Sequence, residues 1–271
     1  MTKNKSSDSL PNFETPPVSE VVFGVQFEVV KEFKSPHLGV LWGKLSRDRY
    51  PDYQEVNFLP HIIEMDQNTV QTMPLIEGNA FPLPRVFFIN PTGHELVQVQ
   101  QDRFLRNWRK NSPEDSYPRY EVLFPKFEES LEKFEQFISE EFDGTKLNID
   151  QYELTYVNHI NINESNLSAK QLSKYFSFYA DDIPQTFLPN PVGIGWNAIY
   201  ELPDEQGKLR VSLSPVNNST GKGQFVLNLT ARGINKQKDL KSWFEVAHEW
   251  IVRGFTDITC KQAQQENWGI K

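Results

Sequence analysis

The sequence lacks most of the features that identify the common classes of protein. It has one cysteine among 271 residues, Cys260, so no disulfide can form within the chain. No apolar run approaches the roughly 20 residues that span a bilayer. The polar start MTKNKSSDSLPNF has no apolar core of a signal peptide. These absences favour a cytoplasmic protein with no membrane partner.

A net positive charge and recognisable catalytic motifs are also missing. Lys and Arg number 28 against 36 Asp and Glu, a formal net charge of -8, which argues against nucleic acid because phosphate binding needs clustered cations. The five histidines are scattered and form no HExxH zinc motif. The glycines at 193–195 and 221–223 match no phosphate loop. The sequence therefore predicts no metal, no cofactor and no catalytic residue, and it favours a protein that is not an enzyme without deciding the matter.

What the chain does contain is an order of elements that occurs twice. Each half predicts a strand, a helix, several strands and a long closing helix. The first strands are expected at 19–30 and 151–162, and the closing helices at 120–142 and from Asp239 onward. The long helix at 120–142 carries one apolar stripe, as a helix packed on a sheet should.

We therefore predict an α+β fold built by tandem duplication of a unit of strand, helix, antiparallel strands and long helix. A disordered tail covers 1–14, the first repeat 15–145 and the second repeat 146–271, and the two repeats pack as one continuous body. The order of elements is that of TATA-binding-protein-like and helix-grip folds, in which a curved antiparallel sheet wraps a long helix. Such an analogy does not fix a function.

The most distinctive segment is HELVQVQQDRFLRNWRK, at 94–110. Side chains alternate from Glu95 to Gln100 and then lose their phase, so we expect a strand with a bulge. Four cations and two aromatic residues follow within a few positions, and Arg and Trp are the types that dominate protein interfaces. The predicted interaction surface comprises Asp102, Arg103, Phe104, Arg106, Trp108, Arg109 and Lys110.

Two other interpretations of this segment remain open. In the first, the Arg stems cover the sheet and pair with Glu on the adjacent long helix. In the second, the cations bind nucleic acid or a phosphate ligand. Within the cluster, Arg103 is expected to be the structural member, because it is in phase with Val97 and Val99.

Three blocks, at 16–28, 98–110 and 243–268, resemble an uncharacterised, sporadically distributed bacterial protein family of unknown function. The resemblance spans nearly the whole chain and implies no activity. It implies a bacterial, cytoplasmic protein, and a patchy distribution suggests a defence or toxin-antitoxin-like context.

Two functions follow from these observations. The first is a non-enzymatic binding module whose partner is another protein, with its oligomeric state undetermined. The alternative is a carrier of a small apolar ligand, or a helix-grip-type enzyme, with a cavity between the sheet and a long helix. The candidate cavity residues are Tyr152, Tyr156, His159 and Trp196. His248, on the last helix, is expected to be an ordinary surface or core histidine.

Overall fold

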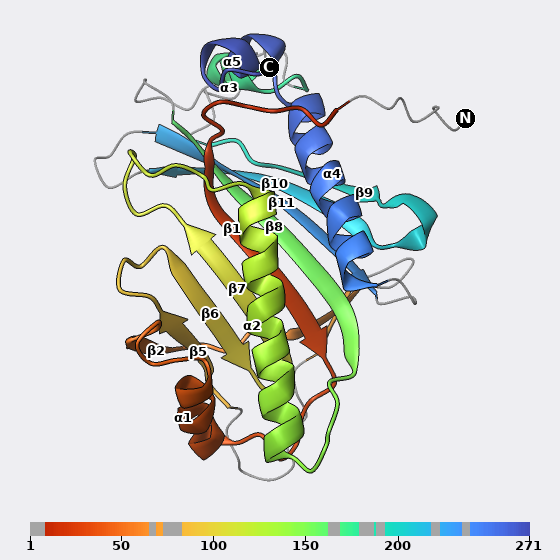
Figure 1. Ribbon diagram of the computed structural model, residues 1–271. Coiled ribbons are helices and arrows are strands. Elements are labelled where there is room, and N and C mark those ends of the chain that lie inside the picture. The colour runs from red at the N-terminus through yellow and green to blue at the C-terminus, as the bar shows by residue number, and fades with distance from the viewer. Residues whose placement is uncertain are drawn as a thin grey trace.

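The computed structural model describes residues 9–64, 69–72, 83–161, 169–178, 187, 193–217, 223–234 and 239–271. Its main element is a nine-stranded antiparallel sheet with the order β2-β5-β6-β7-β1-β8-β11-β10-β9 (Figure 1). The strands are β1 (Val18–Phe27), β2 (Asp52–Val56), β5 (Arg85–Ile89), β6 (Glu95–Gln100), β7 (Arg103–Arg109), β8 (Ile149–Asn161), β9 (Trp196–Glu201), β10 (Lys208–Asn217) and β11 (Gly223–Ile234). The predicted α+β class is confirmed.

The centre of the sheet is the antiparallel pair β1 and β8, the first strand of each predicted half. Phe23 lies opposite Leu154 in this pair, and both side chains are buried. Alternation along each strand gives the sheet one aromatic, apolar face and one polar face. Because β1 and β8 are hydrogen-bonded along their length, the chain forms one continuous sheet.

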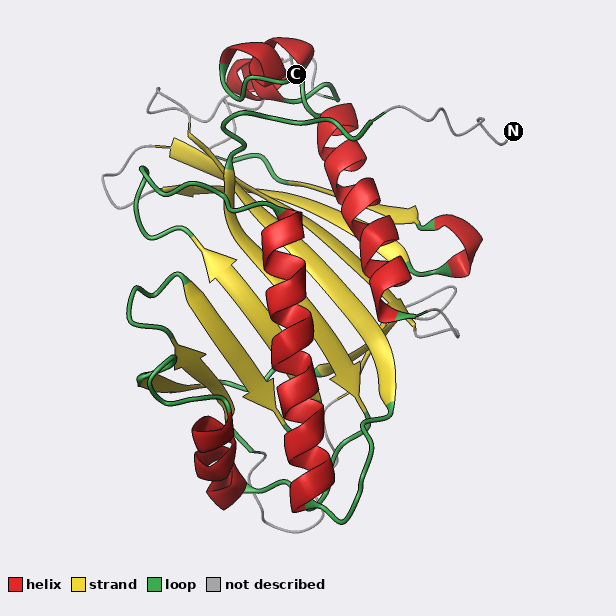
Figure 2. Cartoon of the chain, in the orientation of Figure 1, coloured by secondary structure: helices red, strands yellow, loops and turns green. Residues whose placement is uncertain are grey.

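Two long helices cover the apolar face, as Figure 2 shows. The helices are α1 (Ser35–Lys44), α2 (Tyr120–Glu141), α3 (Ala169–Tyr175), α4 (Leu240–Ile258) and α5 (Lys261–Glu266), with a 3-10 turn, η1 (Pro203–Glu205). Asp239 caps α4, because its side chain accepts a hydrogen bond from the Ser242 N–H at 2.9 Å. Among the described residues, no helix has both the length and the apolar character needed to cross a membrane.

The chain reverses where the sequence predicts a bulge. β6 ends at Gln100, β7 begins at Arg103, and these two residues are direct partners across the strands. Gln101 and Asp102 therefore form a two-residue turn, and the alternation loses its phase because the chain changes direction. The predicted single bulged strand is wrong. Residues 103–109 instead form a strand between β6 and β1.

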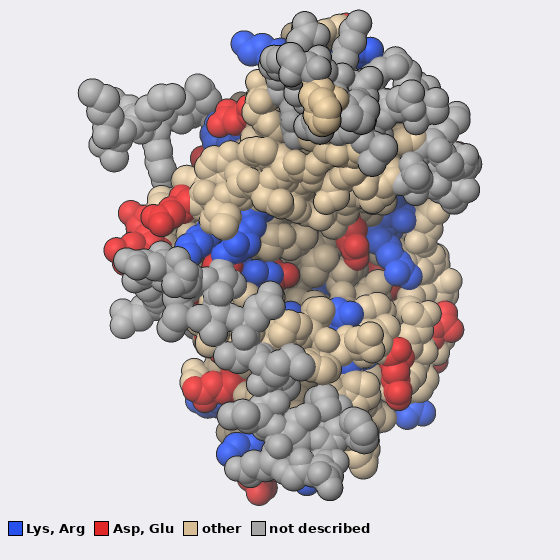
Figure 3. Space-filling model, turned by 180° about the vertical axis from the view of Figure 1, so that it is seen from behind, with Lys and Arg blue, Asp and Glu red and all other residues tan. Residues whose placement is uncertain are grey.

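A short second hairpin, β3 (His61–Glu64) and β4 (Thr69–Thr72), forms its own two-stranded sheet. We call residues 59–64 the strap, because they lie against the polar face of the main sheet through side-chain hydrogen bonds. Seen from behind, charged side chains of both signs gather in the middle of this face (Figure 3).

The N-terminal arm, residues 10–16, runs past the end of α4 to meet the C-terminus (Figure 1). The Glu14 N–H donates to Gly269 O at 3.0 Å, and the Lys271 N–H donates to Asn12 O at 2.9 Å. Phe13 is 5% exposed and packs against Phe255. The predicted disordered tail over 1–14 is therefore wrong for residues 12–14, whereas residues 1–8 lie outside the described part of the chain.

Candidate functional site

Five of the seven residues predicted to form a protein-binding surface are buried. None of the five is more than 5% exposed. They are Asp102, Arg103, Phe104, Arg106 and Trp108. The predicted surface is wrong for these residues, because β7 is paired on both edges and covered on both faces. Only Arg109 and Lys110, at the end of the strand, are partly exposed.

Arg106 lies between the sheet and α2. Its guanidinium donates to the Tyr50 hydroxyl at 2.6 Å and to the Ser130 hydroxyl at 2.8 Å, and it pairs with Glu95 at 2.7 Å. Burial alone would raise the pKa of Glu95, but a hydrogen bond from Lys126 and the charge of Arg106 outweigh burial and lower that pKa. The interpretation in which the arginines pair with glutamates is thus right that an ion pair forms. It is wrong that the glutamate belongs to the long helix, since Glu95 lies on β6.

On the opposite face of the sheet, the side-chain amides of three glutamines hold the strap. They form hydrogen bonds with its backbone groups, as the backbone of a neighbouring strand would. Gln100 exchanges two hydrogen bonds with the Leu59 backbone, at 2.7 and 2.8 Å. Gln26 does the same with Ile62, at 2.7 and 3.0 Å, and Gln151 donates to the same carbonyl at 2.7 Å. Amide side chains can do this because each has one acceptor and two donors. The polar face therefore binds a segment of its own chain.

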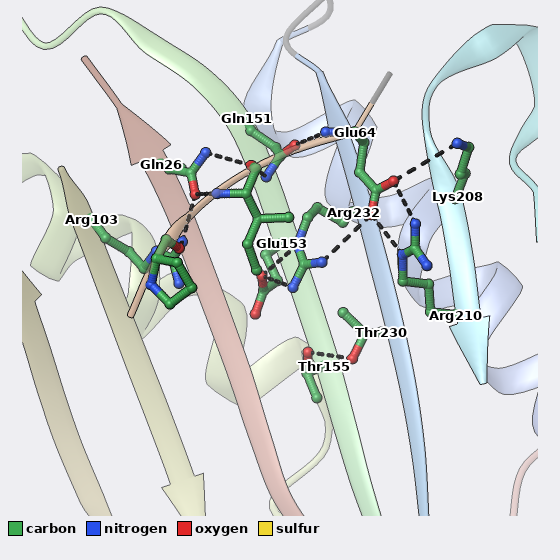
Figure 4. A network of polar contacts seen from close by, with 12 residues as sticks. Gln26, Glu64, Arg103, Gln151, Glu153, Thr155, Lys208, Arg210, Thr230 and Arg232 are labelled. Atoms are coloured by element: carbon green, nitrogen blue, oxygen red, sulfur yellow. Dashed lines mark hydrogen bonds and ion pairs between the residues drawn. The ribbon is translucent and has the colours of Figure 1, made fainter. Parts of the chain in front are cut away.

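A buried carboxylate completes the attachment of the strap (Figure 4). Glu64, whose side chain is 1% exposed, receives two hydrogen bonds from Arg210, at 2.7 and 2.9 Å. Arg232 lies 3.5 Å from Glu64 and also pairs with Glu153 at 2.6 Å. A buried charge needs such partners, because desolvation without them is costly. These side chains are engaged with one another, so the network is a structural attachment.

His61 ties the strap to the turn between β6 and β7. Its ring nitrogens lie 2.9 Å from Asp102 and 3.2 Å from Asp150. The hydrogen bond to Asp102, followed by that to Asp150, raises the pKa of His61 to about 9 against the opposing effect of burial. The imidazole is therefore protonated at neutral pH and acts as a cation between two carboxylates.

The four candidate cavity residues do not lie together. Tyr152 and Tyr156 are buried under the helices, and Tyr156 lines a cavity. His159 is exposed on the opposite face and borders an open groove. Trp196 lies away from both, stacked on Phe178 with ring centroids 4.0 Å apart. Only Tyr156 is therefore part of the cavity that the structure contains.

This cavity, of about 300 Å³, lies between the apolar face of the sheet and the two long helices. The start of α2, the C-terminal half of α4 and the strands β8 and β11 form its walls, and the N-terminal arm crosses it. Side chains that line it include Tyr117, Tyr120, Tyr156, Asn158, His248 and Phe255. Its walls therefore combine aromatic rings and aliphatic side chains with several polar groups, a composition that small-molecule sites share.

The tyrosines of the cavity carry buried hydroxyls. The Tyr117 and Tyr156 hydroxyls are hydrogen-bonded at 2.8 Å. The Tyr120 hydroxyl is buried and has no hydrogen-bond partner within the described residues, an uncommon state for a buried polar atom. Burial raises the pKa of all three phenols, so each stays neutral over the physiological range.

His248 is the other polar side chain of interest. Its ring stacks on Tyr120 with centroids 4.1 Å apart and an interplanar angle of 7°. Within the described residues, its nitrogens have no hydrogen-bond partner. Burial lowers the pKa of His248 to about 4, although Glu121 and Glu249 act in the opposite direction. A neutral imidazole therefore faces the cavity with one donor and one acceptor.

The arm is held over the cavity by Arg119, the residue before α2. The Arg119 guanidinium donates to Phe13 O at 2.6 Å and lies over the Tyr117 ring. Its backbone has φ 80°, in the left-handed region, which costs energy for a residue with a side chain.

In the described part of the chain, no three His, Cys, Asp or Glu side chains are grouped so that they could hold a metal ion. Comparison with protein-family models, with curated proteins and with solved structures finds no match for this chain. The family resemblance therefore stays a prediction, and any statement of function depends on the geometry of the site.

Little in the sequence could have located this cavity. Its walls come from the arm, α2, β8, β11 and α4, which are distant in the chain and meet only through sheet pairing. The one local signal is the aromatic pair Tyr117 and Tyr120 before a long helix. In the sequence His248 looks like an ordinary histidine, because no second histidine lies one helical turn away. Its lack of a hydrogen-bond partner among the described residues becomes evident only in the folded chain.

Proposed function

We propose that the protein is a non-enzymatic binding module that holds a small apolar ligand in the cavity between the sheet and the long helices. The observation that carries this proposal is a cavity of about 300 Å³, lined by aromatic and aliphatic side chains, in which neutral polar groups have no hydrogen-bond partner among the described residues. Pockets of this size and composition bind small molecules in many proteins. A carrier needs no catalytic group, and the neutral tyrosine and histidine side chains of the lining are compatible with binding alone.

The other function favoured by the sequence is the binding of another protein, and the segment 102–110 is the surface predicted for it. Burial of five of its residues removes that support. The strap adds a second argument, because it already covers part of the polar face of the sheet. A small-molecule ligand is therefore the better-supported proposal, within the cytoplasmic setting that the sequence favours.

We also propose that the two halves arose by duplication. From the centre outward, the first half runs β1, β7, β6, β5, β2, and the second runs β8, β11, β10, β9, so the first half has one additional edge strand. In each half the first strand is central, the last strand is its neighbour, and the preceding strands follow in reverse order. The long helices α2 and α4 follow the corresponding strands β7 and β11. This agreement supports a repeated, TATA-binding-protein-like unit.

The test of ligand binding is native mass spectrometry of freshly purified full-length protein, followed by extraction and identification of what is bound. Val252→Trp should remove the ligand, because Val252 lines the cavity and an indole would fill it. Val122→Trp is the matched control, since Val122 is 48% exposed on α2 and outside the cavity. Far-UV circular dichroism checks that both variants fold. A clean apo mass in several preparations, with no binding of added small molecules, would refute the proposal.

A further inference from the structure

We infer that the ligand of this cavity is an uncharged aromatic molecule of one or two rings that carries a hydroxyl group. The inference rests on the proposed function and adds the chemical class of the ligand. Size, charge and hydrogen bonding each contribute an independent argument.

Size limits the ligand to a small ring system. A dry cavity of roughly 150 Å³ is enough to hold benzene. The cavity here is about 300 Å³, so it has room for one ring or a fused pair. A long acyl chain or a sugar oligomer would not fit within it.

Shape favours a flat molecule over an aliphatic one. Tyr120 lies between two parallel rings, His248 at 4.1 Å on one side and Phe124 at 5.3 Å on the other. Tyr117 and Tyr156 meet edge to face with centroids 6.0 Å apart. Because both faces of Tyr120 are occupied, a further aromatic ring would meet these tyrosines in edge-on contact, which aromatic rings favour. The walls therefore favour an aromatic guest.

Charge selects a neutral molecule. The two charged residues of the lining, Arg119 and Glu121, are adjacent at the start of α2 and opposite in sign. The Arg119 guanidinium is committed to the carbonyls of the arm, and Glu121 is exposed. No other charged side chain of the described lining is available to pair with an ion. An anionic ligand would therefore lose its hydration without a partner, which is costly, and a cation would find one only at the exposed Glu121 carboxylate, where water competes.

Hydrogen bonding explains the hydroxyl group. His248 is neutral, so its ring offers one donor and one acceptor, and neither is used by the described residues. A ligand hydroxyl is both donor and acceptor, and it can bond either nitrogen. The Tyr117 and Tyr156 pair can donate only one further proton, because one hydroxyl hydrogen is used between them.

The test compares three naphthalene probes that differ only in their substituent. Binding of 2-naphthol, 2-naphthoate and naphthalene to the full-length protein is measured by isothermal titration calorimetry at neutral pH. At this pH naphthol is neutral and naphthoate is anionic. We expect naphthol to bind at least about tenfold more tightly than naphthoate, the factor that an unpaired buried charge easily exceeds.

His248→Phe then isolates the hydrogen bond, because it keeps an aromatic ring at this position. We expect naphthol affinity to fall about tenfold, the usual effect of one lost hydrogen bond, and naphthalene affinity to change little. His159→Phe is the matched control: the same substitution at an exposed histidine on the other face of the sheet should leave all three affinities unchanged.

The outcomes separate the two proposals. The proposed ligand class would be overturned if naphthoate bound as tightly as naphthol, or if His248→Phe weakened the binding of naphthol and naphthalene equally. The carrier proposal would still stand if a native ligand were present in the unmodified protein and absent from Val252→Trp. Recovery of an aliphatic native ligand would have the same meaning. If no probe binds and no native ligand is found, both proposals fail.

Discussion

At the scale of single residues, Arg106 shows how a charge that looks like a surface feature can be part of the core. It is 3% exposed and pairs with Glu95. We predict that Arg106→Met lowers the free energy of unfolding by about 3–5 kcal/mol, because it leaves a half-buried carboxylate with one partner fewer. Urea unfolding measures the change.

Arg109→Met is the control for this experiment. The Arg109 side chain donates to Gly93 O at 2.8 Å and is partly exposed, so its loss should cost about 1 kcal/mol. The sequence alone predicts that Arg106→Glu with Arg109→Glu retains near-native stability. The structure reverses that expectation, and a stable double variant would show that the Arg106 ion pair contributes little.

His61 should make stability fall at alkaline pH. Its pKa is raised from 6.5 to about 9 by Asp102 and Asp150, so the folded state holds the proton more tightly than the unfolded state. The stabilisation is complete below pH 6.5 and is lost as the pH rises through about 9. Urea unfolding at intervals across this range should show the decline, and His61→Gln should flatten it. An unchanged slope in the variant would contradict the prediction.

His248 should act in the opposite direction. Burial lowers its pKa from 6.5 to about 4, while Glu121 and Glu249 partly oppose that shift. The unfolded state therefore binds the proton more readily, and stability should decrease as the pH falls from 6.5 towards 4. His248→Phe should reduce this acid sensitivity, as measured by thermal melting at each pH. Equal acid sensitivity in the variant would argue that the imidazole is already protonated.

At the scale of elements, the arm is the segment whose role differs most from the sequence prediction. Phe13 packs on Phe255 and Trp268 at 5.3 and 6.5 Å between ring centroids. Phe13→Ala should cost about 3–5 kcal/mol, as for other buried phenylalanines. Leu10→Ala, at a residue 37% exposed, should cost less than about 1 kcal/mol. If chemical denaturation showed equally small losses of unfolding free energy in both variants, the arm would be only loosely attached.

The sequence predicts the regular elements well and their reversals poorly. Periodic patterns locate α2, α4, β1 and β8, because each has a continuous buried face. The turn at Gln101 and Asp102 contains neither glycine nor proline, so the usual signal of a reversal is missing. Arg103 is buried as expected, but the reason given is wrong: Val97 and Val99 face the helices, whereas Arg103 bonds Gln26 on the other face.

At the scale of the whole molecule, the predicted halves share one sheet. The β1 and β8 strands pair over nine register positions, so neither half can lose its sheet without exposing the edge of the other. We predict a single cooperative unfolding transition, with coincident urea curves from tryptophan fluorescence and far-UV circular dichroism. Separated curves would indicate that the halves unfold independently.

What the sequence could not reveal at this scale is which distant segments meet. The strap reaches β10 through Glu64 and Arg210, which are 146 positions apart, and the cavity needs five separate segments. The spacing of apolar residues and the composition of the sequence describe each segment by itself. The pairing that brings them together is a property of the complete sheet, and the buried state of Arg106 and His248 follows from it.

The central position of β1 has a consequence for synthesis of the protein. β1 is complete at Phe27, but its two partners, β7 and β8, end at Arg109 and Asn161. A ribosome that adds about 5–20 residues per second leaves this apolar segment without a partner strand for several seconds. During that time Val21, Phe23 and Val25 have no sheet to cover them, so the nascent chain exposes apolar surface of the kind that favours aggregation.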